Sequence, residues 1–399
     1  GQAGAIEPFF SRRIGLSNMG MPIPVDGGAR LISRSPKRGY GGLMMRQREH
    51  GDSPAAYFGV GRYSKNFGKQ NRIGGMITSR FDEGNEVYQS ATNMTYSIDG
   101  FFRPTQPLSW SFMASASTSS ENSDEGFAAT SQLIYNSNKL YLFYYQSLIS
   151  RQYDPKVGFV YSNDIINTNF GGYRIFRPKW KPKALRQLDP GAYINIYHSL
   201  SDGSFQQAEI EIFPLYFVFV KGALFYTYII PTWQRLDQPF NPLGINIPPG
   251  NYQYNRFRIY YGNDQSRKLS FRLRYEDGGY YKVRLQAWYS QVRYSPIPQI
   301  SMSFSFEQNN FYGLENETTT KKTQLITPEL RLAVNPRIQL IGFYQKNTAI
   351  DRDIWNVRFS WEFAPLSFIY LVYNSNTFDT IDRVQNEQVI GKITFLKQF

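Results

Sequence analysis

Apolar and polar residues alternate one by one along many stretches of the chain. Residues 300–307 read Ile-Ser-Met-Ser-Phe-Ser-Phe-Glu, and similar alternation occurs at 108–115, 269–276 and 357–363. In the stretch 108–115, Met113 is the one apolar residue at a polar position. Because successive side chains of a β-strand point to opposite faces, this pattern predicts strands with one apolar and one polar face.

Turn-forming residues divide the chain at regular intervals. Pro, Gly or Asn occur near positions 36, 69, 105, 137, 180, 222, 265, 297, 336 and 365. Each interval of about thirty to forty residues leaves room for two strands of about ten residues and a loop. A soluble β-sandwich also alternates, but its strands average about six residues. Longer strands of this kind fit segments that cross a membrane obliquely.

The connections between the expected strands are of two kinds. Tight ones contain Pro or Asn, and they lie at 103–107, 136–139, 334–337 and 363–366. Longer polar ones lie at 118–125, 237–251 and 315–322. For strands that cross a bacterial outer membrane, we expect the tight set at the periplasmic end and the longer set outside.

No stretch approaches the roughly 18 uninterrupted apolar residues of a membrane helix. The nearest one, residues 212–233, contains Lys221-Gly222 at its centre. A Lys-Gly pair between two apolar runs is typical of a turn, so we expect a hairpin there.

Ten such hairpins and the strand Gly27–Arg34 give about 21 strands, and Phe9–Leu16 could supply one more. We therefore expect an all-β protein, a transmembrane antiparallel β-barrel of about 22 strands, with 18 or 20 as alternatives. Residues 1–26 would enter the barrel and residues 27–399 would form it.

The end of the chain fits the same interpretation. Val389, Gly391, Ile393, Phe395 and Phe399 share one face of the last expected strand. A final strand that ends on an aromatic residue resembles the assembly signal of outer-membrane barrels, so we assign this role to Phe395 and Phe399.

Composition narrows the choice further. Aromatic residues make up 17% of the chain, yet its mean hydropathy is −0.45. A membrane barrel combines rings at both membrane interfaces with a polar lumen, and this combination agrees with it. The absence of cysteine excludes disulfides, thiolate metal sites and cysteine nucleophiles.

The net charge of +13 is spread along the chain. A nucleic-acid-binding protein usually gathers its basic residues in a patch, so we expect no nucleic-acid partner. On three successive expected strands, alternating positions carry arginines that could form a basic ladder in the lumen and attract anions. In the alternative, these arginines pair with carboxylates such as Glu276 and only stiffen the wall. The ladder residues are Arg256, Arg258, Arg272, Arg274 and Arg284.

Catalytic chemistry has little material here. The chain has two histidines, His50 and His198, which leaves almost nothing for a Ser-His-acid triad or a histidine metal site. Glu209 and Glu211 have the spacing of paired carboxylates, but acids balanced by arginine are the favoured interpretation. We expect no enzyme, no metal and no cofactor.

Most tyrosine and tryptophan rings are expected at the lipid headgroups. Trp288 and Tyr260 are the candidates for rings that face inward and stack on a sugar.

Two separated stretches resemble a family of outer-membrane proteins common in Bacteroidota, a barrel domain of unknown function that often follows a carbohydrate-binding, family-9-like sandwich domain. The stretches are residues 7–15 (Glu-Pro-Phe-Phe-Ser-Arg-Arg-Ile-Gly) with 27–31, and residues 153–160 (Tyr-Asp-Pro-Lys-Val-Gly-Phe-Val) with 177–182. The segments 359–363 and 371–374 resemble its closing hairpins. The resemblance implies a barrel and assigns no catalytic residue. Sugar binding credited to the sandwich domain is not carried over.

Two functions of different class follow from this interpretation. The first is porin-like passage or binding of small anionic or saccharide solutes through a basic lumen. The second is a plugged barrel that acts as a scaffold or subunit of an outer-membrane complex, because a wide barrel with mostly short loops would leak if empty. The expected partners are outer-membrane lipids, lipopolysaccharide and a protein or lipoprotein plug.

Overall fold

The computed structural model describes residues 6–16, 23–51, 53–85, 89–121, 125–313, 320–378 and 384–396. It is all-β, with 71% strand and one large antiparallel sheet of 23 strands. The expected fold class is therefore confirmed at this level, and the number of strands is close to the expected one. In the described part of the chain, helical structure is limited to two short 3-10 turns, and none of it could span a bilayer.

The chain divides into two compact units. Unit 1 consists of Gly1–Tyr173 with Tyr193–Ala208, and unit 2 of Arg174–Ala192 with Glu209–Phe399. The strands β11 (Ile165–Arg174), β13 (Gly191–His198) and β14 (Phe205–Phe213) have residues in both. Each unit is described by itself.

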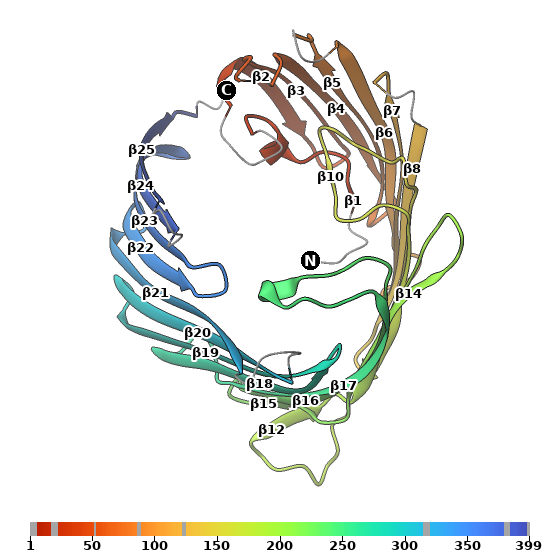
Figure 1. Cartoon of the computed structure of the whole chain (residues 1–399), viewed down its shortest axis with the longest axis vertical. Coiled ribbons are helices and arrows are strands. Elements are labelled where there is room, and N and C mark those ends of the chain that lie inside the picture. The colour runs from red at the N-terminus through yellow and green to blue at the C-terminus, as the bar shows by residue number, and fades with distance from the viewer. Residues whose placement is uncertain are drawn as a thin grey trace. The chain divides into compact units, whose positions relative to one another are not determined.

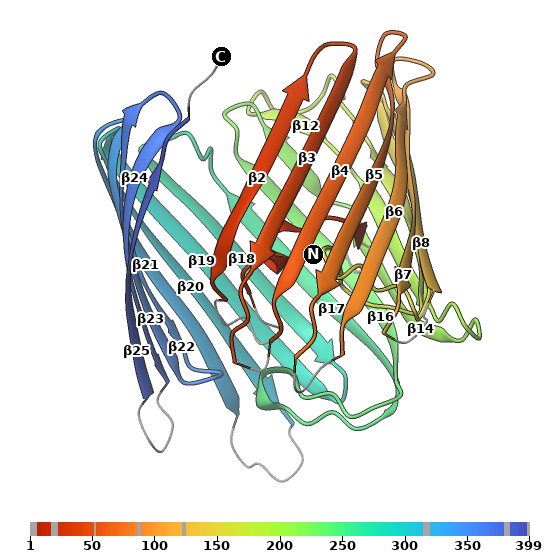
Figure 2. The same ribbon diagram turned by 90° about the horizontal axis from the view of Figure 1, so that it is seen from above.

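Unit 1 is built mainly from long neighbouring hairpins, and Figure 2 shows several of these strands side by side. Its other elements are β1 (Ile6–Glu7), the 3-10 turn η1 (Ser11–Arg13), β2 (Val25–Arg34), β3 (Arg38–Gln47), β4 (Ala56–Phe67), β5 (Asn71–Asp82), β6 (Ala91–Phe102), β7 (Leu108–Ser119), β8 (Glu125–Asn136), β9 (Leu140–Ile149) and β10 (Phe159–Val160).

Unit 2 continues the same hairpin pattern, seen as the green to blue strands of Figure 1. Its other elements are β12 (Leu185–Leu188), β15 (Tyr216–Phe219), β16 (Leu224–Leu236), the 3-10 turn η2 (Pro242–Gly244), β17 (Gly250–Gly262), β18 (Leu269–Tyr280), β19 (Val283–Ile297), β20 (Ile300–Tyr312), β21 (Lys321–Asn335), β22 (Ile338–Asn347), β23 (Arg352–Ala364), β24 (Ser367–Phe378) and β25 (Val384–Thr394).

The alternating stretches of the sequence form strands whose register keeps like residues on the same side. In unit 2, Phe304 lies opposite Val292, while its neighbour Ser303 lies opposite Arg293. Residues directly opposite each other in a sheet point to the same face. Each unit thus has what we call an apolar face, as at Phe304, and a polar face, as at Ser303.

Many large apolar side chains remain exposed on the apolar faces. In unit 1, Leu31 is 66% exposed and Met44 is 72% exposed. In unit 2, Trp288 is 50% exposed and Val389 is 68% exposed. Within each unit, these side chains lack the second layer that would bury them in a soluble β-sandwich.

Tight turns form where the sequence predicts them. The Asn335 side-chain oxygen accepts hydrogen bonds from the backbone N–H groups of Arg337 (2.8 Å) and Ile338 (3.0 Å), which fixes the turn between β21 and β22. The hairpin expected around Lys221-Gly222 is confirmed as β15 and β16. Gly222 has φ +79°, a conformation that favours glycine.

One of the longer connections is described completely. Residues 237–249 join β16 to β17 and fold back on unit 2, where Ile245 and Ile247 are 2% exposed and pack against Tyr252 and Val283. Parts of the other two longer connections, and the terminal Phe399, lie outside the described residues.

The expectation that Phe9–Leu16 supplies a spanning strand is wrong. Residues 11–13 form η1, and Gly15 has φ +79°, so the segment turns instead of extending. The Phe10 N–H donates to the Val157 carbonyl (2.8 Å), which ties the segment to another loop. Just before it, β1 pairs with β10.

Together these two segments cover part of the polar face of unit 1. We call residues 6–16 and 150–164 the unit 1 cap. Val157 of the cap is completely buried against Ala56 and Phe58 of β4. Tyr153 is also completely buried, and its hydroxyl donates to the Ser115 Oγ of β7 (2.8 Å). Burial raises the pKa of Tyr153 to about 12, so its hydroxyl keeps the proton that it donates.

Polar contacts hold the cap at both of its ends. The Asn93 side chain on β6 donates to the Asp154 carbonyl (2.9 Å) and accepts from the Lys156 N–H (3.0 Å). At the far end, the Asp164 carboxylate accepts hydrogen bonds from Arg151 (3.0 Å) and from the Ser201 N–H (2.8 Å). Burial alone would raise the pKa of Asp164, but these hydrogen bonds outweigh it and lower the pKa below its usual value.

The first prediction concerns Gly158, where the two cap segments cross. A Cβ at this position would lie 2.3 Å from the Glu7 carbonyl oxygen and 2.8 Å from that of Pro8. We expect Gly158→Ala to detach residues 6–16 and to speed tryptic cleavage at Arg12 and Arg13 several-fold, measured by mass spectrometry of timed digests.

The matched control is Gly61→Ala, because a Cβ at Gly61 has nothing within 4 Å. Its cleavage rate should equal that of the wild type. Equal cleavage of the Gly158→Ala variant and the wild type would show that the cap does not depend on this close approach.

Candidate functional site

The residues singled out by the sequence converge on β17, β18 and β19 of unit 2. In β17 and β18, Arg258 lies opposite Glu276 and Tyr260 opposite Arg274. In β18 and β19, Arg274 lies opposite Tyr289. These side chains therefore share the polar face of unit 2.

A buried ionic network occupies one part of this face. Glu276 accepts from Arg256 Nη1 (2.8 Å) through Oε1 and from Arg258 Nε (2.7 Å) through Oε2. From β14, Glu209 Oε2 pairs with Arg256 (2.9 Å) and Glu211 Oε1 pairs with Arg258 (3.0 Å). The Glu276 side chain is only 9% exposed, so its charge depends on both arginines.

For Arg256 and Arg258, this network distinguishes a basic ladder with available charge from arginines that pair with carboxylates. Arg256 and Arg258 are neutralised by carboxylates and brace neighbouring strands, as in the alternative that the sequence left open. Glu209 and Glu211 are balanced by these arginines, which is the interpretation that the sequence favoured over a pair of catalytic carboxylates.

Arg284 does not belong to the ladder. It lies opposite Gly279, whereas the neighbouring Leu285 lies opposite Gly278 on the polar face. The guanidinium of Arg284 pairs instead with Asp277, with Nε to Oδ1 at 2.9 Å and Nη2 to Oδ2 at 2.7 Å. The sequence of β19 alone does not show which face Arg284 occupies. The pairing of β19 with β18 places its side chain on the apolar face.

Arg272 and Arg274 are the ladder residues that keep their charge available. Neither forms an ion pair in the part of the chain that the structure describes. The Arg274 guanidinium lies over the Tyr289 ring, with Cζ 5.2 Å from the ring centroid. A tyrosine ring carries no formal charge, so this contact does not neutralise the guanidinium. Arg272 and Arg274 therefore give this part of the polar face a positive potential.

A row of tyrosines runs beside these arginines. Tyr216 stacks on Tyr226 with ring centroids 5.1 Å apart, and Tyr226 stacks on Tyr260 at 4.5 Å, with the last pair nearly parallel at 5°. Arg274 and then Tyr289 continue the row on the next two strands. We call Tyr216, Tyr226, Tyr260 and Tyr289 the tyrosine row.

The two candidates for sugar stacking lie on opposite faces. Tyr260 belongs to the tyrosine row, but the Tyr226 ring already covers one of its faces. Trp288 lies opposite Gln308 and Tyr275 on the apolar face, where its ring centroid is 4.3 Å from that of Tyr275. Trp288 therefore does not face the polar wall, because its position in β19 has the opposite parity to Tyr289.

The histidines have structural surroundings. The His198 ring packs edge-on against Phe205 with centroids 5.9 Å apart. His50 forms a backbone bridge with Ser53. Among the described residues, no group of three or more His, Cys, Asp or Glu side chains is placed to hold a metal ion.

Sequence reasoning missed three members of the tyrosine row and the unit 1 cap. Tyr226 and Tyr228 alternate with Phe225 and Thr227, so hydropathy does not indicate which side faces the arginines. The row becomes visible only through the register across strands. The cap had a signal: residues 150–164 lose the alternation of the flanking strands and contain Pro155.

No protein-family model matches the chain, and a search of curated proteins found no relative.

The second prediction concerns the ionic network. Glu276→Gln places an amide between two guanidinium groups and leaves them under-compensated, so we expect the free energy of unfolding to fall by about 3 kcal/mol. Urea titration of the refolded protein in detergent micelles, followed by tryptophan fluorescence, measures this change.

Asp237→Asn is the matched control. The Arg235–Asp237 pair is 2.8 Å long, but its side chains are 46% and 51% exposed. Loss of such an exposed pair should cost less than about 1 kcal/mol. Equal losses in the two variants would contradict a stabilising role for the buried network.

Proposed function

We propose that the sheet closes into a transmembrane β-barrel of a bacterial outer membrane, like the Bacteroidota family that the sequence resembles. Large exposed side chains such as Leu31, Met44 and Trp288 on the apolar faces support this proposal, since contiguous apolar surface of this kind is costly in water. A bilayer also requires that the sheet have no open edge, because unpaired backbone groups in lipid are costly.

We further propose that the polar face lines a passage for small anionic solutes. The observation that carries this is the pair Arg272 and Arg274 beside the tyrosine row, neither of which has an ion-pair partner in the part of the chain that the structure describes. Cations without a carboxylate partner raise the local concentration of anions and can exchange hydrogen bonds with them. Saccharides have less support. The Tyr226 ring already covers one side of the Tyr260 ring, and Trp288 lies on the apolar face of the sheet instead of the polar face.

A second candidate is a plugged barrel that serves as a scaffold. The unit 1 cap favours it, because buried Tyr153 and Val157 show that part of the polar wall is occupied by the chain itself. In this version, the cap fills the role expected of a separate plug, and a partner protein or lipoprotein would bind elsewhere on the barrel.

The third prediction separates these functions. In planar bilayers with a salt gradient, we expect the wild type to form steady channels that favour chloride over potassium. The double variant Arg272→Gln/Arg274→Gln should lower this preference several-fold, because it removes the charges without counter-ions. The reversal potential measures the preference.

Arg284→Gln is the control for this experiment, since its guanidinium is paired with Asp277 on the apolar face. Its selectivity should match the wild type. A wild type that inserts but conducts no current would favour the scaffold. Unchanged selectivity in the double variant would remove Arg272 and Arg274 from the passage.

The fourth prediction tests the membrane itself. Phe304 is exposed on the apolar face of β20, and Ser303 beside it lies on the polar face between Arg293 and Glu329. Phe304→Arg should lower the free energy of unfolding in lipid vesicles by about 2–4 kcal/mol, because it exposes a charge to acyl chains.

Ser303→Arg, with the same new side chain one residue away, should change this free energy by less than about 1 kcal/mol. The comparison is made by urea titration in vesicles. Equal effects at the two positions would mean that the apolar face does not contact lipid.

A further inference from the structure

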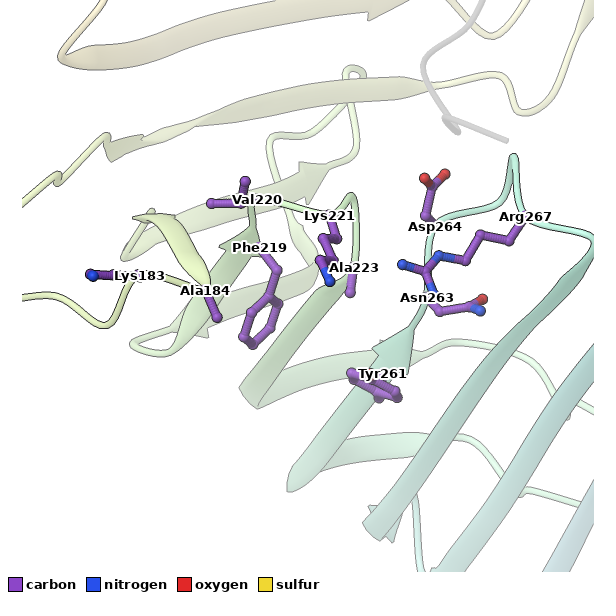
Figure 3. A pocket seen from close by; sticks show the side chains of 10 residues that line it. All are labelled: Lys183, Ala184, Phe219, Val220, Lys221, Ala223, Tyr261, Asn263, Asp264 and Arg267. Carbon is purple, nitrogen blue, oxygen red and sulfur yellow. The ribbon is translucent and has the colours of Figure 1, made fainter.

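A cavity lies at the tight-turn end of unit 2. It has a volume of about 450 Å³ and is bordered by residues 183–184, the turn between β15 and β16 and the turn between β17 and β18. Figure 3 shows its lining side chains. The position next to tight turns would place it near the periplasmic leaflet if the barrel spans a membrane as proposed.

Two cations meet at this cavity. In Figure 3, the Arg267 guanidinium extends toward the side of the cavity on which Lys221 lies, while Lys183 points away. Neither Lys221 nor Arg267 forms an ion pair within the described parts of the chain. Because neither cation is in an ion pair, their charges repel each other, and an anion bound between them would be stabilising.

The Asp264 carboxylate also lines the cavity, where it is hydrogen-bonded within its own turn. Asp264 accepts hydrogen bonds from the Ser266 N–H (2.9 Å) and from the Ser266 hydroxyl (2.8 Å). These hydrogen bonds, together with the Arg267 charge, lower the pKa of Asp264 below its usual value. In Figure 3 its carboxylate points away from the Arg267 guanidinium, and within the described residues it forms no ion pair with Arg267 or Lys221.

Aromatic rings provide an apolar floor that continues along the sheet. Phe219 and Tyr261 line the cavity below the two cations. Tyr261 contacts the Phe271 ring with centroids 5.7 Å apart. Next along β18 on the same apolar face, Leu269 is 52% exposed and Leu273 is 46% exposed. An apolar path therefore leads from the cations onto the surface that we propose contacts lipid.

We propose that this cavity binds a glycerophospholipid with an anionic headgroup. Lys221 and Arg267 hold the phosphate, and an acyl chain lies against Tyr261 and the apolar face beyond it. Charge complementarity and the continuous apolar path select a lipid over a water-soluble anion, since only an amphiphile satisfies both surfaces. The inference rests on the proposed membrane location, and it is independent of what passes through the barrel.

The fifth prediction tests this site. The purified full chain is reconstituted in phosphatidylcholine nanodiscs that contain a small fraction of phosphatidylglycerol, and native mass spectrometry counts the lipids that remain bound. We expect the wild type to retain phosphatidylglycerol. Lys221→Gln/Arg267→Gln should reduce this retention about tenfold, because it removes both phosphate ligands.

Two controls keep the result specific. Lys139→Gln removes an exposed cation from the tight turn between β8 and β9 and should retain phosphatidylglycerol like the wild type. Lys221→Arg/Arg267→Lys keeps both charges and should also retain most of it. Equal retention by the Gln double variant and the wild type overturns the proposal.

A soluble competitor distinguishes the ligand source. Glycerol 3-phosphate carries the same phosphate chemistry without acyl chains, and we expect it not to displace the lipid. Displacement at equal concentrations would mean that the site binds a free anion, which contradicts a lipid site. Failure to insert into nanodiscs would contradict the proposed function, whereas insertion without retained lipid would contradict this inference alone.

Discussion

The separation of each strand into an apolar and a polar side is the constraint on which the rest of the structure depends. An exposed apolar face costs about 25 cal/mol per Å² in water, so a single sheet with such a face needs a second layer or a lipid environment. The antiparallel ladders are compatible with a lipid environment. β16 and β17, for example, pair continuously from Leu224 opposite Gly262 to Leu236 opposite Gly250. Complete ladders satisfy the backbone groups that lipid would leave without partners.

The same separation organises the charges. On the polar face of unit 2, Glu276 and its arginines form a neutralised brace. Arg274 and Arg272, two and four residues from Glu276 in β18, form no ion pair among the described residues. Paired and unpaired arginines therefore share one face, and carboxylate partners on neighbouring strands distinguish them. A charge on the opposite face, such as Arg284, needs its own partner, which Asp277 supplies.

The sequence was sufficient for what depends on local pattern. Alternation identified the strands that contain residues 300–307 and 357–363, and Lys221-Gly222 marked a real turn. It was insufficient wherever the answer depends on how strands pair. Arg284 was expected in the basic ladder and Trp288 was a candidate for an inward-facing ring. Only the register of β19 with β18 and β20 shows that both lie on the apolar face. The tyrosine row could not be predicted for the same reason, because its members are far apart in sequence and come together only through strand pairing.

Segments that lack a repeating pattern were the hardest to anticipate. Phe9–Leu16 was expected to be a strand because an even number of strands needed one more. Instead, Arg13 of this segment donates to the Gly158 carbonyl, 145 residues further along the chain. Closure of the sheet likewise depends on the two units together and not on the pattern of any one strand.

The unit 1 cap has a consequence for biogenesis. Its N-terminal segment is synthesised first but pairs with residues 157–160, and both rest on strands made in between. Contacts of such high sequence separation carry a large loop-closure cost and form late. The earliest residues of the described chain therefore cannot dock until residues 157–160 and the strands of unit 1 beneath them have formed.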